Sequence, residues 1–229
     1  IYNVNLNMYI FKKVLFIFLI LLITNCNENG NSLNLTVYNS ELDILENLNN
    51  GVLVLDIVTN VGVDALYGIE YGGGYIFHFD EQSNTLIVAT DYSQIGNIPW
   101  GDTFPLDTSS IIGSGDVNTQ QIVDGNLNDN SLIGFEHGND NYAFKIVNDL
   151  DHNNFNDWFI PSRDSMTSIY NNLHSMGLGN FSENIIYWSS TKIGYDPYVM
   201  GFNFDSWGGE PFLGSCASPN GIMIARKIN

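Results

Sequence analysis

The stretch from Asp157 to Thr191 constrains the fold of this chain more than any other. It reads Asp-Trp-Phe-Ile-Pro-Ser-Arg at its start and Tyr-Trp-Ser-Ser-Thr at its end. Between these ends, apolar residues recur at the spacing of one helical face, at Met166, Ile169, Tyr170, Leu173 and Met176. Ser162 can cap the first turn of this helix and Gly177 can close its last turn. The sequence therefore predicts a capped helix between two strands.

Apolar patterns on both sides of this block predict the other elements. Alternation from Tyr75 to Ala89, with a turn at residues 81–84, predicts a hairpin, in which we interpret His78 as an ordinary strand residue. Later strands are expected at residues 198–204 and 221–228. Asn118 is expected to cap a short helix that reaches Val123. A second helix follows from the spacing of Tyr142, Ala143, Ile146, Val147 and Leu150. Two helices against a sheet of early and late strands make an α+β fold.

Several short phrases in this order resemble the Lcl C-terminal domain family. They are Tyr71 to Phe77, Pro99-Trp100-Gly101, Asp157 to Ser162, Tyr187 to Thr191 and Ile224-Ala225-Arg226. The resemblance covers roughly residues 68 to 229. It implies a C-type lectin-like fold, with a mixed or antiparallel sheet, two flanking helices and long loops, and a distant likeness to formylglycine-generating enzyme domains. It also implies adhesion at a bacterial cell surface, and for some relatives the binding of sulfated polysaccharides.

The first part of the chain is typical of an export leader. We interpret Met8 as the true start of translation. The basic pair Lys12-Lys13 then precedes ten apolar residues, from Val14 to Ile23. This length suits the core of a secretory signal and is too short to span a bilayer. The run ends at Cys26, as in the lipobox of bacterial lipoproteins, although Asn25 departs from the usual small residue. We therefore expect residues 1–26 to be a signal peptide and Cys26 to carry a lipid. The alternative is an ordinary secretory leader.

The segment between this leader and the domain is expected to be a spacer. Residues 27–67 begin with a polar tether and continue as a short helical stalk, with Leu42, Leu45 and Leu48 apolar and Gly51 closing the helix. The lectin-like domain is then expected over residues 68–229. If Cys26 is lipidated, Cys216 has no disulfide partner. The predicted location is the bacterial cell envelope, on the outer membrane or the cell surface, or else outside the cell.

The charge of the chain limits its partners. Seven basic residues stand against 25 acidic ones, a formal net charge of −18. Loss of a leader containing Lys12 and Lys13 leaves five basic residues, a net charge of −20. Such a surface repels nucleic acid and anionic lipid headgroups. A neutral glycan or a surface protein is therefore the expected partner, with the membrane reached through a lipid anchor.

A long loop near the end of the chain is the predicted ligand site. Loops of this length are usually functional or disordered. Its aromatic side chains can offer a flat apolar face to a sugar ring, and its polar side chains can accept from hydroxyls. The alternative is that the aromatic side chains fold back into the core. The candidate residues are Asp205, Trp207, Glu210, Phe212 and Asn220.

Calcium is the only cofactor that the sequence suggests. Oxygen-bearing side chains alternate at Asp149, Asp151 and Asn153, as at the start of a calcium loop. The pattern then departs from such loops, because the glycine and the final glutamate are missing. The alternative is a plain turn before the strand that begins near Asp157.

Three functions follow from these observations. The first is a cell-surface lipoprotein that binds a glycan or another extracellular ligand in adhesion. The second is a structural subunit of a surface assembly. The third, a formylglycine-generating enzyme, requires a pair of active cysteines, and only Cys216 lies in the domain. We therefore expect no catalytic residues.

Overall fold

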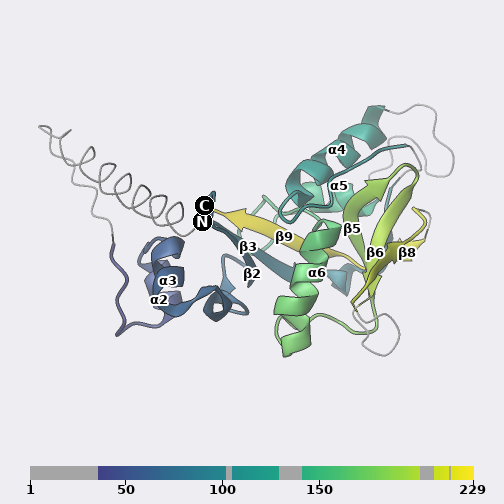
Figure 1. Cartoon of the computed structure of the whole chain (residues 1–229). Helices are drawn as coiled ribbons and strands as arrows, with labels where there is room; N and C mark the ends of the chain where they lie inside the picture. Colours follow the sequence, from purple (N-terminus) through teal and green to yellow (C-terminus); the bar gives the residue numbers. More distant parts are fainter. Residues whose placement is uncertain (1–35, 102–104, 129–140, 202–208, 217) are drawn as a thin grey trace, which may run out of the picture. The chain divides into compact units, whose positions relative to one another are not determined.

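A four-stranded antiparallel sheet, in the order β1-β2-β3-β9, joins the first hairpin to the end of the chain (Figure 1). The structure is a computed structural model that describes residues 36–229 apart from 102–104, 129–140, 202–208 and 217. The strands are β1 (Glu70–Tyr71), β2 (Gly74–Asp80), β3 (Thr85–Asp91) and β9 (Met223–Ile228). The predicted hairpin and the predicted last strand are both confirmed.

The other strands form two smaller units. A three-stranded sheet contains β5 (Ile186–Ile193), β6 (Asp196–Gly201) and β7 (Pro211–Leu213), and β4 (Ile98–Pro99) pairs with β8 (Pro219–Asn220). All strand pairs described in these sheets are antiparallel. The α+β class is confirmed, but the late strands do not share one sheet, because only β9 pairs with the hairpin.

The predicted helix lies on one face of the four-stranded sheet as α6 (Arg163–Asn172), followed by the 3₁₀ helix η3 (His174–Met176). As expected, the Ser162 hydroxyl accepts from the Ser165 N–H, and Gly177 has the left-handed conformation, with φ 72°. Met176 was expected on the buried stripe but is 70% exposed. The reason is that the α-helix ends at Asn172, after which α-helical spacing no longer predicts which face a residue occupies.

The opposite face of the sheet carries the helices that precede it. These are α2 (Ile44–Asn49), α3 (Val54–Val61) and η1 (Val63–Leu66), within the segment that the sequence analysis assigned to a spacer. Their apolar residues share one core with Ile76, Leu86 and Val88, and residues 36–229 form one compact unit. Asp43 caps the N-terminus of α2, in a capping box with Glu46.

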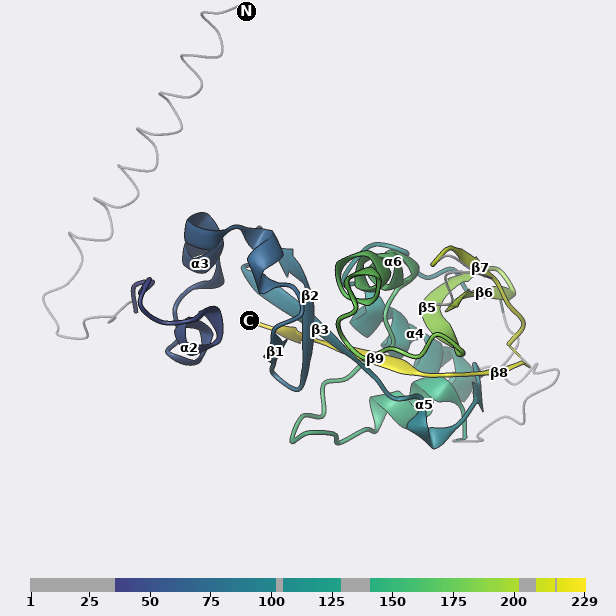
Figure 2. The same cartoon turned by 90° about the horizontal axis from the view of Figure 1, so that it is seen from below.

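A third core lies further along the sheet, around α4 (Gly115–Asn128) and α5 (Ala143–Asn148). The short 3₁₀ helix η2 (Ser93–Ile95) follows β3 in the chain. Figure 2 shows α5 and α6 on opposite sides of β9, consistent with the alternation of Ile224 and Ala225 between the two cores. Asn118 does not cap α4 as expected. It lies inside the helix, where its buried amide bonds to both backbone groups of Ser109 and to the Ser190 hydroxyl.

The second predicted helix, α5, is confirmed with Tyr142 as its N-cap residue. Over the part of the chain that the structure describes, none of the helices is both long enough and apolar enough to cross a bilayer.

Candidate functional site

The predicted ligand loop is described in part. Asp205, Trp207 and the predicted lipidation site Cys26 lie outside the described residues. Glu210 is exposed, whereas Phe212 lies in β7 with its ring partly buried against the core around Trp188. Asn220 lies in β8, opposite Ile98 of β4. The described residues of this set thus lie on a loop and two strands, and of its two aromatic side chains Phe212 packs against the core, as the alternative expected.

The predicted calcium residues lie in the turn after α5, where Asp149 and Asn153 form hydrogen bonds with other protein groups. The Asp149 carboxylate accepts from the Lys145 ammonium group, and this hydrogen bond, with one from Asn148, lowers the pKa of Asp149. Asn153 donates its amide to the Gly73 carbonyl, while Asp151 is exposed. Among the described residues, no three His, Cys, Asp or Glu side chains gather as metal ligands would. Calcium binding at this turn stays a prediction.

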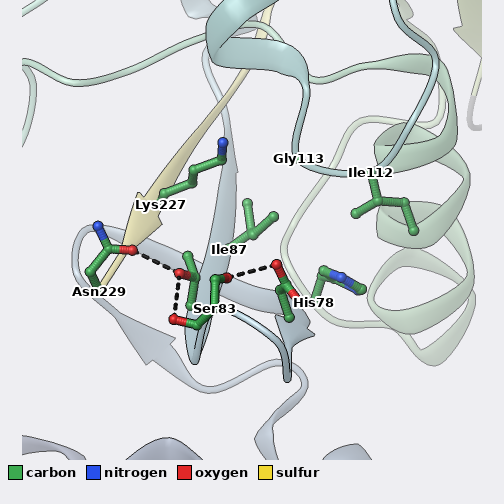
Figure 3. A pocket seen from close by; sticks show the side chains of 9 residues that line it. His78, Ser83, Ile87, Ile112, Gly113, Lys227 and Asn229 are labelled. Carbon is green, nitrogen blue, oxygen red and sulfur yellow. Dashed lines mark hydrogen bonds between the residues drawn. The ribbon is translucent and has the colours of Figure 1, made fainter.

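A polar hollow of about 420 Å³ lies on the α6 face of the four-stranded sheet, near the turn between β2 and β3 and the end of β9 (Figure 3). Strand register explains its lining. His78, Ile87 and Lys227 form one cross-strand row, and Asp80 and Thr85 form the next, with Asn229 beside Thr85. Residues paired across neighbouring strands point to the same face of a sheet. Three strands therefore supply one polar surface.

A β-bulge positions His78 in this hollow. Ile76 pairs with Val88 and His78 pairs with Ile87, so the partner strand advances by one residue while β2 advances by two. The extra residue is Phe77, which enters the core beneath α6. A bulge redirects the side chains that follow it. As a result His78 and Phe77, though adjacent in sequence, lie on the same face, and His78 lines the hollow rather than serving only as a strand residue.

The loop of Ile112 and Gly113 closes the hollow on one side. Gly113 has φ +82°, and a Cβ there would lie 3.1 Å from the Ile87 side chain. Only glycine combines this conformation with so close an approach. The Gly113 N–H donates to the Ser165 hydroxyl at 3.0 Å, which ties the loop to α6.

Hydrogen bonds organise the acidic end of the hollow. Asp80 accepts from the Ser83 hydroxyl at 2.7 Å and from the Gln82 N–H at 3.0 Å, and these bonds lower its pKa. The Thr85 hydroxyl donates to the Asn229 amide oxygen at 2.7 Å (Figure 3). Asp80 is therefore an ionised acceptor with lone pairs to spare, because each carboxylate oxygen can accept more than one hydrogen bond.

The two basic groups of the hollow carry little free positive charge. Partial burial lowers the pKa of His78, against a weaker opposite effect from Asp80, so the imidazole is neutral at pH 7. A neutral imidazole offers one donor and one acceptor. The Lys227 ammonium group lies 2.8 Å from the Asp116 carboxylate in the first turn of α4. Together with Ile87 and Ile112, these groups suit a ligand with many hydroxyl groups and some apolar surface.

The sequence analysis did not foresee this hollow. No local sequence pattern predicts it, because its lining residues come from three separate segments, 78–87, 112–113 and 227–229. The polar residues His78 and Asp80 in an otherwise apolar strand were the available clue. Comparison with models of protein families and with curated proteins found no match for this chain.

Proposed function

We propose that this chain is an extracellular binding module for a neutral, hydroxyl-rich ligand, a glycan in the first place, which it holds without transforming it. The observation that carries the proposal is the hollow around His78 and Asp80. Sugar hydroxyls both donate and accept, and the hollow offers a carboxylate acceptor, a neutral imidazole and an amide beside two isoleucines. Its volume of about 420 Å³ lies within the ~300–1,000 Å³ typical of small-ligand sites.

The distribution of charge supports an uncharged ligand. Each of the four surface cations in the described part of the chain forms an ion pair: Lys145 with Asp149, Arg163 with Asp164, Arg226 with Asp157, and Lys227 with Asp116. The other described cation, Lys192, is buried with its ammonium group 4.5 Å from the centre of the Trp100 ring. A polyanion would have to displace these carboxylates and approach a chain of net charge −18.

The finer fold and the location belong to the same proposal. A C-type lectin-like domain of the Lcl C-terminal kind is supported by the pairing of the first hairpin with the last strand, with the helices in the chain between them. An export leader with a lipid at Cys26 would hold such a module on the bacterial envelope. The alternative of a structural surface subunit is favoured by three large side chains at the β5–β6–β7 sheet, each at least 55% exposed: Ile193 and Leu213 on its strands and Tyr195 in the turn between β5 and β6.

Binding of neutral sugars tests the main proposal. The probes are the methyl glycosides of glucose, galactose, mannose and N-acetylglucosamine, titrated into ¹⁵N-labelled protein. We expect at least one to shift the amide signals of His78, Asp80 and Thr85 saturably. Asp80→Asn should weaken that binding about tenfold, because a hydrogen bond to a charged carboxylate is stronger than one to a neutral amide.

Asp56→Asn is the matched control, since Asp56 is an exposed carboxylate on α3, away from the hollow. It should leave the affinity unchanged. The proposal is wrong if none of the four glycosides shifts these signals, or if a sulfated disaccharide binds more tightly than every neutral sugar.

A further inference from the structure

A second hollow of about 360 Å³ lies along α6, and it shares one lining residue, Ile112, with the first. The remainder of its lining comes from the helix: Asp164, Thr167, Ser168, Asn171 and Asn172. The two hollows therefore adjoin at Ile112. In Figure 3, Ile112 and His78 both lie on the side of the first hollow that faces the helix.

The position of Ile112 is determined by its neighbours in the loop. The Ser162 hydroxyl donates to the Ile111 carbonyl at 2.7 Å, and the Gly113 N–H donates to the Ser165 hydroxyl at 3.0 Å. Both serines belong to the start of α6. The loop is thus held on the helix immediately before and immediately after Ile112, so the boundary between the two hollows is fixed to one rigid element.

The second hollow combines apolar surface, which is the larger part, with four side chains that carry uncharged polar groups, Thr167, Ser168, Asn171 and Asn172. Ser168 and Asn172 both donate to the Phe77 carbonyl, at 3.4 and 3.0 Å, which ties this face of α6 to the strand that carries His78. Asn171 is exposed, and its amide offers two donors and an acceptor. Asp164 is paired with Arg163 at 2.9 Å. The second hollow is therefore less polar than the first, but like the first it offers both hydrogen-bonding groups and apolar surface.

We propose that the two hollows form one groove that binds consecutive residues of a neutral oligosaccharide, with Ile112 against the apolar face of the chain where it passes between them. This inference rests on the proposed function and adds to it that the ligand is a polymer. Two adjoining hollows that each offer hydrogen-bonding groups and apolar surface suit a chain of sugar residues, because every residue presents both hydroxyl groups and an apolar face. Binding energy then grows with chain length until both hollows are filled.

The affinity for oligosaccharides of increasing length tests this inference. The probes are the methyl glycoside that binds best and its β-linked oligomers of two, three and four residues, measured by calorimetry. We expect the affinity to rise about tenfold or more from one residue to three and then to level off. Asn171→Ala should lower the affinity for the trisaccharide about fivefold without changing that for the monosaccharide. Asp80→Asn should lower both.

The matched control is Asn60→Ala, since Asn60 is an exposed asparagine on α3. It should change neither affinity. Equal affinity for one, two and three residues would overturn the groove and leave the single-sugar site standing, whereas failure of every sugar would remove the proposed function itself. Saturation of the same amide signals by a neutral Gly-Ser-Asn peptide, with no response to any oligosaccharide, would overturn the inference in favour of a peptide groove.

Discussion

Arg226 joins three parts of the fold through one guanidinium group. It lies on β9 and bonds both oxygens of Asp157, at 2.7 and 2.9 Å, and the carbonyl of Gly72 at 2.9 Å. Its guanidinium carbon also lies 3.7 Å from the centre of the Phe155 ring. The side chain is only 11% exposed. A planar group with several donors can make all these contacts at once, which a lysine ammonium cannot.

Replacement of Arg226 should therefore destabilise the fold. We expect Arg226→Ala to lower the free energy of unfolding by about 2–3 kcal/mol, and Arg226→Lys by about 1–2 kcal/mol, because the ring contact and the bidentate bond are lost. Urea unfolding measures both. Lys145→Ala is the control, since it breaks an exposed pair one helical turn apart and should cost about 0.5 kcal/mol or less. Equal costs for Arg226→Ala and Lys145→Ala would refute this role of Arg226.

Residues at the start of α6 stabilise two elements, the helix itself and the neighbouring loop of Ile112 and Gly113. Ser162 is fully buried. Its hydroxyl accepts from the Ser165 N–H, donates to the Ile111 carbonyl and lies 2.8 Å from the Ser165 hydroxyl. One residue thus caps the helix and holds the loop that borders both hollows.

Removal of the Ser162 hydroxyl should affect both α6 and the loop of Ile112 and Gly113. Ser162→Ala should lower the free energy of unfolding by about 1–2 kcal/mol, since the cap of α6 is lost and the Ile111 carbonyl keeps only its hydrogen bonds from Ser114. In ¹⁵N spectra the signals of Ile112 and Gly113 should also move. Ser175→Ala, an exposed serine in η3 that bonds the Asn171 carbonyl, is the control and should cost less than about 0.5 kcal/mol. A destabilised variant with unmoved loop signals would disprove the link between cap and loop.

The whole molecule carries an excess of negative charge that its ion pairs do not balance. The formal net charge is −18, and the four ion pairs in the described part of the chain involve four of its 25 acidic residues. Repulsion among the remaining carboxylates is stronger in the compact state than in the unfolded chain. Salt screens this repulsion and also weakens the exposed pairs, but such pairs contribute little.

We therefore expect salt to stabilise the protein. The midpoint of thermal unfolding should rise by several degrees between about 0.02 M and about 0.5 M sodium chloride, over which the screening length falls from well above ~10 Å to a few Å. The variant Glu41→Gln, Glu70→Gln, Glu183→Gln removes three exposed carboxylates and should show a smaller rise. A fall of the midpoint with salt, or an equal rise in the variant, would contradict this account.

Local patterns in the sequence were sufficient for the elements whose formation depends on near neighbours. The α6 helix with its cap Ser162 and its terminal Gly177, the hairpin of β2 and β3, and the α5 helix all follow from spacing and turn chemistry, which act over a few residues. The exposure of Met176 could not be predicted in this way, because it depends on where the helix ends.

Local sequence patterns were enough to predict the class of the fold, its main helix and hairpin, and a net charge that disfavours polyanionic partners. The location of the candidate ligand site became visible only once the chain was folded. The bulge at Phe77 directs His78 into the hollow, and the pairing of β3 with β9 brings Lys227 and Asn229 beside residues about 140 positions earlier. Such contacts depend on strand register and on which distant segments pair. These are properties of the packed chain as a whole, and a pattern in a short stretch of sequence does not contain them.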